Sequence, residues 1–259
     1  MPTRSEAILL FACAAMLLAA VFAPPLAQPA HLHDFADRRV LWGVPFALDV
    51  LSNLPFAFAG VLGLHALQGL PARSVDATER ACARLFFIGL LVTTAASAWY
   101  HLQPSDAGLA IDRGGMAIAF AGLLALLAAT RVSARAGIAL GAAVLLLAPA
   151  SVATWYQTGN VLPWAIVQFG GIAVIVLVLA TTRVRPGALD VRWSLVLLAY
   201  AVAKWLEVND HAIFEASGEL LSGHTLKHVL AAAAAWPVIA AVNGPVRRQN
   251  GPRAPAHAA

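Results

Sequence analysis

The chain has 259 residues, of which 60% are hydrophobic and only 12% are charged. A soluble domain carries about twice this share of charged residues, so the composition excludes an ordinary soluble globule and indicates an integral membrane protein. The formal net charge of +4 comes almost wholly from arginines in the loops between apolar runs. Such arginines are typical of topology signals, and no nucleic-acid partner is predicted.

Eight runs are apolar and long enough to cross a bilayer as helices, which takes about 20 residues each. They cover roughly residues 7–24, 46–67, 81–102, 109–130, 134–154, 161–181, 192–209 and 224–243. These runs are too long to be strands of a membrane barrel. The sequence therefore predicts an all-α membrane protein in which seven helices, from residue 46 onward, form a transmembrane bundle.

Three regions are expected along the chain. Residues 1–30 have a basic start, an apolar middle and a small-residue end, which fits either a secretory signal peptide or an extra first helix. Pro24 and Pro25 end this run in both cases. Residues 31–245 are expected to form the seven-helix domain, and the Ala-rich stretch 246–259 a disordered cytoplasmic tail.

The distribution of arginine predicts the orientation in the membrane. The loops near 68–80, 131–135 and 182–192 and the C-terminal tail carry arginines, whereas the loops between them are uncharged or acidic. Positive charge marks the cytoplasmic side, so the C-terminus is predicted to be cytoplasmic. Arg38 and Arg39 lie in a segment that this orientation places outside, and they oppose it weakly. The Ala- and Arg-rich composition is typical of a bacterial inner-membrane protein.

Polar residues gather at the predicted outer ends of several helices. Ser97 and His101, four residues apart, end the run at 81–102, and Asp112 begins the next run. His224 and His228, again four apart, begin the last run. Residues four apart share one face of a helix. Further polar residues at the same depth are Asp49, Ser52, Asn53, Glu207 and Asp210. Ionisable groups are costly in a membrane, so this gathering indicates a functional site.

The residue types indicate a metal site. Two histidines four apart on a helix can bind one metal ion, and a third from a facing helix completes a three-histidine site with an open position, as in catalytic zinc sites. Asp112 could orient a ligand or accept a proton from water, and Ser97 could donate to an oxyanion. Taken singly, Ser97 also fits a helix-packing hydroxyl. The remaining histidines fit interfacial positions: His31, His33, His65 and His211.

The spacing of this set resembles a known family. Ser97-x3-His101-x10-Asp112, followed by His224-x3-His228, resembles the alkaline ceramidase family, part of a group of seven-helix membrane hydrolases that includes adiponectin-receptor-like proteins. The segment LSNLPF at 51–56 is also similar to the family's first-helix motif, and the resemblance spans roughly residues 45–245.

The resemblance implies a zinc-dependent amidase. His101, His224 and His228 would bind Zn²⁺, Asp112 would be the general base, and Ser97 would hold the attacking water and stabilise the oxyanion. The substrate implied is ceramide or a related long-chain N-acyl lipid, cleaved at its amide bond to a fatty acid and an amine. The site would lie near the outer leaflet.

The chain departs from the family at two places. Eukaryotic members have an acidic N-terminal segment that binds Ca²⁺, whereas here Arg38 and Arg39 directly follow Asp37, which disfavours calcium. Lys227 stands between the last two histidines, in place of the family's aromatic-containing spacer. A cation near the outer boundary can meet an anionic headgroup, so the natural substrate is left open.

Two other functions remain as alternatives. A receptor-like member of the same group would keep the same five residues with little turnover. A transporter would instead need polar groups through the full depth of the membrane. Inner helix halves such as GIALGAAVLLLAPA contain almost none, so the sequence favours the metal-site hypotheses.

Overall fold

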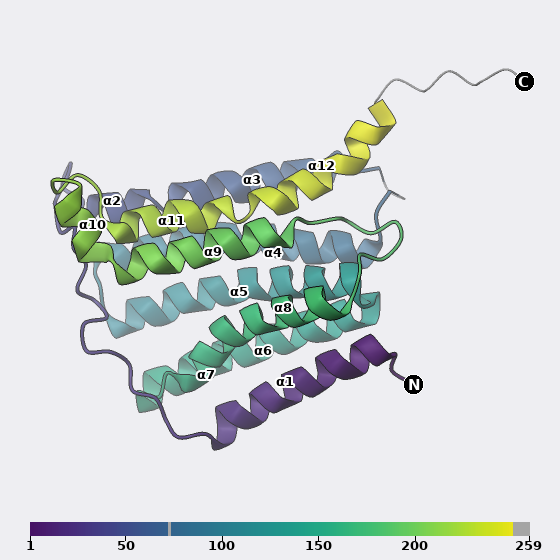
Figure 1. The fold of residues 1–259 in the computed structure, drawn as a ribbon. Coiled ribbons are helices and arrows are strands. Elements are labelled where there is room, and N and C mark those ends of the chain that lie inside the picture. Colours follow the sequence, from purple (N-terminus) through teal and green to yellow (C-terminus); the bar gives the residue numbers. More distant parts are fainter. Residues whose placement is uncertain (72–73, 251–259) are drawn as a thin grey trace, which may run out of the picture.

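Long helices lie side by side in a computed structural model of the chain, which describes residues 1–71 and 74–250 (Figure 1). The helices of this described part are α1 (Arg4–Phe22), α2 (Ala47–Leu51), α3 (Leu54–Gln68), α4 (Ala77–Leu102), α5 (Asp106–Arg131), α6 (Ala134–Thr158), α7 (Leu162–Ala165), the π-helical turn η1 (Ile166–Gly170), α8 (Gly171–Thr181), α9 (Trp193–Val208), α10 (Asp210–Ala216), α11 (Gly223–Ala233) and α12 (Trp236–Asn250). The predicted tail therefore begins within α12, and its residues from 251 onward lie outside the described part, as does Arg73.

The prediction of an all-α protein with a seven-helix membrane bundle is confirmed. Seven helical spans in the described part are long and apolar enough to cross a membrane. Three of them are built from consecutive helices: α2 with α3, α7 with η1 and α8, and α11 with α12. The seven include α1, whereas α9 has only 16 residues and packs against α11.

Helix α1 packs on the bundle through a few specific contacts. Its first turn is closed by a capping box between Thr3 and Glu6. Glu6 also accepts hydrogen bonds from Ser133 (2.6 Å) and Arg135 (2.6 Å) at the start of α6. Leu9 is buried, while most other α1 side chains are exposed. An apolar face left open in this way fits a helix that borders lipid.

Short polar side chains define where the helices of the bundle begin. Asp76, Ser105, Ser133 and Ser222 accept hydrogen bonds from backbone N–H groups in the first turns of α4, α5, α6 and α11. Such caps satisfy N–H groups that have no partner within the helix. Two of them, Ser105 and Ser222, set the starts of the helices that carry Asp112 and the last two histidines.

Glycines bring the helices that carry these residues into close contact. A Cβ atom added at Gly122 of α5 would lie 2.2 Å from the backbone nitrogen of Phe86, and one added at Gly89 of α4 would lie 2.4 Å from that of Ala119. A Cβ added at Gly223 of α11 would lie 2.2 Å from the carbonyl oxygen of Leu206 in α9. Only glycine permits these approaches, which fix α4 against α5 and α11 against α9.

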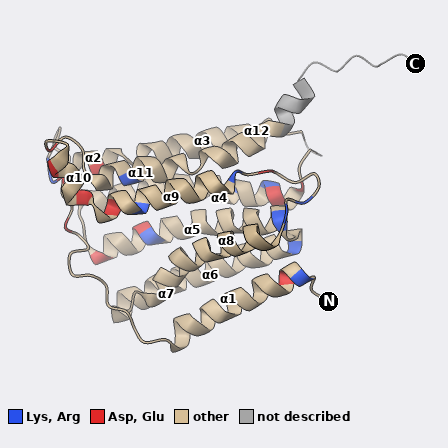
Figure 2. Cartoon of the chain, in the orientation of Figure 1, with Lys and Arg blue, Asp and Glu red and all other residues tan. Residues whose placement is uncertain are grey.

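The two ends of the bundle differ in charge (Figure 2). Arginines gather at the end where α1, α4 and α6 begin. The opposite end, around α2 and α10, carries most of the acidic residues. His101, Asp112 and His224 all lie toward this second end, because α4 ends there and α5 and α11 begin there.

Candidate metal centre

Three histidines meet at the acidic end of the bundle. His101 lies in the last turn of α4, and His224 and His228 lie one turn apart on α11. Their side chains are buried, and their ring centroids form a triangle with edges of 4.8, 4.9 and 5.0 Å. One nitrogen from each ring lies within 4.8 Å of the others. This buried group could therefore hold a metal ion.

The spacing of two of the ring nitrogens fits two ligands of one metal ion. Zinc–nitrogen bonds of about 2.0 Å in tetrahedral geometry separate the ligand nitrogens by about 3.3 Å. Nε2 of His101 and Nε2 of His224 are 3.3 Å apart. Two nitrogen lone pairs that face each other at this distance repel, unless a proton or a metal ion lies between them.

His228 is oriented by Ser52, the residue that caps the end of α2. The Ser52 hydroxyl lies 2.7 Å from Nδ1 of His228 and donates its own proton to the carbonyl oxygen of Asp49 (2.9 Å). Its oxygen therefore accepts from the Nδ1–H group, which leaves the Nε2 lone pair of His228 free for a metal. This is the arrangement in which an outer partner fixes a ligand histidine.

Ser97 and Asp112, the two further residues predicted for the site, contact each other at the same end of the bundle. Ser97 is one turn before His101 on α4, and its hydroxyl neighbours the carboxyl group of Asp112 on α5. Both side chains are buried. Oδ1 of Asp112 has no hydrogen-bond partner among the described residues, so it is available to accept a proton or a hydrogen bond.

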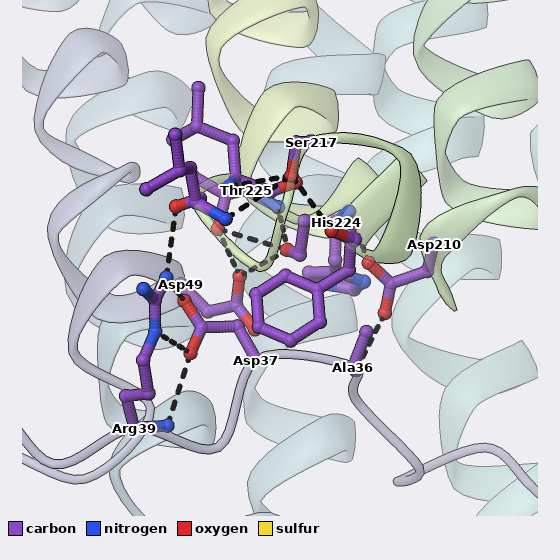
Figure 3. Close-up of polar contacts among 12 residues, drawn as sticks. Ala36, Asp37, Arg39, Asp49, Asp210, Ser217, His224 and Thr225 are labelled. Atoms are coloured by element: carbon purple, nitrogen blue, oxygen red, sulfur yellow. Dashed lines mark hydrogen bonds and ion pairs between the residues drawn. The ribbon is translucent and has the colours of Figure 1, made fainter. Parts of the chain in front are cut away.

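A second polar layer supports α11 from the side of α2 (Figure 3). The fully buried carboxylate of Asp49 accepts hydrogen bonds from Thr225 (2.6 Å) and, more weakly, from Ser222 (3.4 Å). Asp210 accepts from the backbone N–H of His224 (2.7 Å). The sequence predicts Asp49, Ser52 and Asp210 at the same membrane depth as the histidines. It does not predict their hydrogen bonds, which depend on tertiary packing.

The segment of residues 31–40, here named the strap, covers two of the three histidines, His101 and His224. The Phe35 ring lies edge-on to His224 and His101, with centroid distances of 4.5 and 4.8 Å. Ala36 N–H donates to Asp210 (3.0 Å), the residue that also holds His224. His33, expected at an interface, contacts the hydroxyl of Tyr100 (2.8 Å). The strap thus excludes water from one side of the histidine group.

An ion pair between the partly exposed Arg39 and the buried Asp37 anchors the end of the strap. Arg39 donates two hydrogen bonds to the carboxylate of Asp37 (2.8 and 2.7 Å) and one to the carbonyl oxygen of Leu220 (2.9 Å), just before α11. Burial alone raises the pKa of Asp37, but the hydrogen bonds from Arg39 outweigh it and hold this pKa below its usual value. Asp34 pairs with Arg38, so each of the two carboxylates of this segment forms an ion pair with an arginine.

Two lysines and one glutamate border the histidines on the side of α9. Lys227 donates to Oε1 of Glu207 (3.2 Å) and lies 2.9 Å from Nε2 of His224. Lys204 pairs with the other oxygen of Glu207. The three side chains are partly exposed, at 18% for Lys227, 32% for Glu207 and 30% for Lys204. Lys227 thus connects the buried His224 to partly exposed polar side chains of α9.

An apolar groove lies in the middle of the bundle. It runs between α5, η1 with α8, and α9, and is lined by residues such as Phe120, Leu124, Ile172 and Tyr200. The Tyr200 hydroxyl is buried and lies one helical turn before Lys204 on α9. The groove is small and apolar, and none of the three histidines lines it.

No family model and no curated protein matches the chain.

Proposed function

We propose that this membrane protein is a zinc-dependent amidase that cleaves long-chain N-acyl lipids. The observation that carries the proposal is the buried triangle of His101, His224 and His228. The buried carboxylate of Asp112, at the same end of the bundle, has one oxygen without a partner among the described residues. Three nitrogen ligands with an open side are the ligand set of catalytic zinc sites. The resemblance of the five spaced residues to the alkaline ceramidase family supports the same chemistry.

Each residue has a defined part in amide hydrolysis. The three histidines would hold the metal, which when bound supplies Lewis-acid polarisation of a carbonyl and lowers the pKa of water. Asp112 would take a proton from the attacking water while the water oxygen forms a bond to the carbonyl carbon. The Ser97 hydroxyl would donate to the oxyanion. The carbon–nitrogen bond then breaks, and the proton held by Asp112 passes to the leaving amine.

The place of the site supports a lipid substrate. The histidines lie at one end of a bundle of membrane-spanning helices, where an acyl chain could reach them from the membrane. By the positive-inside rule the arginine-rich end would be cytoplasmic, which puts the site near the outer leaflet. The strap would keep bulk water from the reacting amide, as a closed active site requires.

The first test is the metal content of the detergent-purified protein. We expect about one zinc per chain in the wild type and loss of zinc in His228→Ala, because each buried ligand is needed for tight binding. His65→Ala, at an exposed position on α3, is the matched control and should keep its zinc. Wild-type protein that takes up no zinc after resupply would refute the proposed centre.

The second test separates metal binding from turnover. Asp112→Asn should keep its zinc but release fatty acid from ceramide or other N-acyl lipids about 10²- to 10⁴-fold more slowly, the usual contribution of a general base. Released fatty acid is measured by mass spectrometry. A zinc-loaded wild type without turnover on any N-acyl lipid would favour the receptor-like alternative.

A further inference from the structure

Lys227 is the one charged side chain of α11 and stands beside the proposed metal position. Its ammonium group is 2.9 Å from Nε2 of His224, and a metal on that nitrogen would take up the lone pair. An ammonium group has three donors and no acceptor, so Lys227 would then need another partner besides Glu207.

The charges around Lys227 would favour the binding of an anion. Lys204 and Lys227 are the only two lysines of the sequence, and both contact Glu207. With Glu207 and Asp112 ionised, the two lysines and two carboxylates balance. A divalent metal on neutral histidines would add two positive charges. The next carboxylates, those of Asp49 and Asp210, already accept hydrogen bonds from Thr225 and from the backbone of His224. An anionic ligand between Lys227 and the metal would interact favourably with both positive groups.

Distance restricts where the anion can be on a substrate. A metal about 2.0 Å from Nε2 of His224 would lie within about 5 Å of the Lys227 ammonium group. An amide carbonyl at the metal therefore places Lys227 next to groups one or two bonds from the amide nitrogen. An α-carboxylate fits this separation, whereas a phosphate at the far end of a long headgroup does not.

We propose that Lys227 is a specificity-determining residue that binds a carboxylate on the amine half of the substrate, and that the preferred substrates are N-acyl α-amino acids. This inference rests on the proposed amidase function. Lys204 supports the role because it neutralises Glu207 and leaves the charge of Lys227 for the ligand. A neutral headgroup such as that of ceramide would offer Lys227 only hydroxyl acceptors, which form weaker hydrogen bonds with an ammonium group.

The test compares two ligands that differ only at this group. N-oleoylglycine carries a carboxylate where N-oleoylethanolamine carries a hydroxymethyl group. Binding is measured by titration calorimetry in one detergent, with zinc-loaded Asp112→Asn protein so that neither ligand is consumed. We expect N-oleoylglycine to bind about 10- to 100-fold more tightly, as for a charge-assisted hydrogen bond, and this ratio to collapse when Lys227→Gln is added.

The controls separate a local contact from a general charge effect. Arg135→Gln removes one positive charge at the opposite end of the bundle and should leave the binding ratio unchanged. Lys227→Arg should restore much of the preference. Equal binding of the two ligands, or a preference that survives Lys227→Gln, would overturn the inference.

Oleate is the third ligand, because the product fatty acid is also a carboxylate. If Lys227→Gln weakens oleate alone, Lys227 binds the product and the substrate assignment is wrong. Hydrolysis by the wild type keeps the two proposals distinct. Turnover of both amides without preference refutes the lysine inference and leaves the amidase, whereas a Lys227-dependent preference without any turnover refutes the amidase.

Discussion

Ser52 is the clearest example of a residue that acts on the centre through another side chain. Its hydroxyl holds Nδ1 of His228 at 2.7 Å and thereby directs Nε2 toward the other two histidines. We expect Ser52→Ala to weaken zinc binding by about 10- to 100-fold, the usual effect of losing an outer partner of a ligand histidine. Competition with a chromogenic chelator measures this affinity.

A second buried serine provides the control for Ser52. The Ser151 hydroxyl donates only to the carbonyl oxygen of Ala148 within α6 (2.6 Å). Ser151→Ala therefore removes a buried hydroxyl without touching a histidine, and zinc affinity should not change. Equal losses of affinity in the two variants would show that Ser52 acts through general packing.

At the scale of residues, local spacing predicts which histidines share a helix face but not their hydrogen-bond partners. His224 and His228 share a helix face because they are four apart, and the same local rule places Ser97 one turn before His101. That these two helices meet was expected from shared depth and from the family resemblance. The contact of Ser52 with His228 joins residues 176 positions apart, and no local periodicity encodes it.

At the scale of elements, the strap shows why part of the site escaped prediction. It has neither helical period nor strand alternation, so its path over the histidines is set by contacts to other elements. Phe35 packs on His224 and His101, and the carboxylate of Asp210 binds Ala36. The sequence predicts only a loop here, with two aspartates followed by two arginines, and disfavours calcium binding by it. The ends of the helices, by contrast, follow from local caps such as Ser105 and Ser222.

The pairing of the buried Asp37 with Arg39 should make the strap sensitive to pH. Because hydrogen bonds from Arg39 lower the pKa of Asp37 in the folded protein, the ionised carboxylate stabilises the fold above the unfolded pKa of about 3.9. This contribution is lost as the pH falls through the lower, folded pKa. At neutral pH we expect Asp37→Asn to reduce the free energy of unfolding by about 1–3 kcal/mol.

Thermal unfolding in detergent, followed from neutral pH downward, measures this difference. The gap between the wild type and Asp37→Asn should be constant above about pH 5 and should close at lower pH, because only the wild-type carboxylate is protonated there. The neighbouring Asp34–Arg38 pair is a matched control with exposed side chains. Asp34→Asn should cost less than about 1 kcal/mol, and an effect as large as that of Asp37→Asn would contradict the anchoring role of Arg39.

At the scale of the whole molecule, the charge difference between the two ends predicts the orientation in the membrane. Helix starts at one end carry arginines, and the end with the histidines carries most of the acids (Figure 2). With the arginine-rich end inside, the exposed residue Gln157 at the end of α6 would be external, and the exposed Arg183 after α8 would be cytoplasmic. The two positions are therefore suited to site-directed labelling.

Labelling of single cysteines with a membrane-impermeant maleimide tests this orientation. The background is Cys13→Ala with Cys82→Ala, which removes the two native thiols. In intact cells we expect Gln157→Cys to react and Arg183→Cys to react only after the membrane is permeabilised. The reverse pattern would place the histidine centre near the cytoplasmic leaflet, because the centre and Gln157 lie at the same end of the bundle. The amidase chemistry would stand in that case, but its lipid substrates would have to come from the inner leaflet.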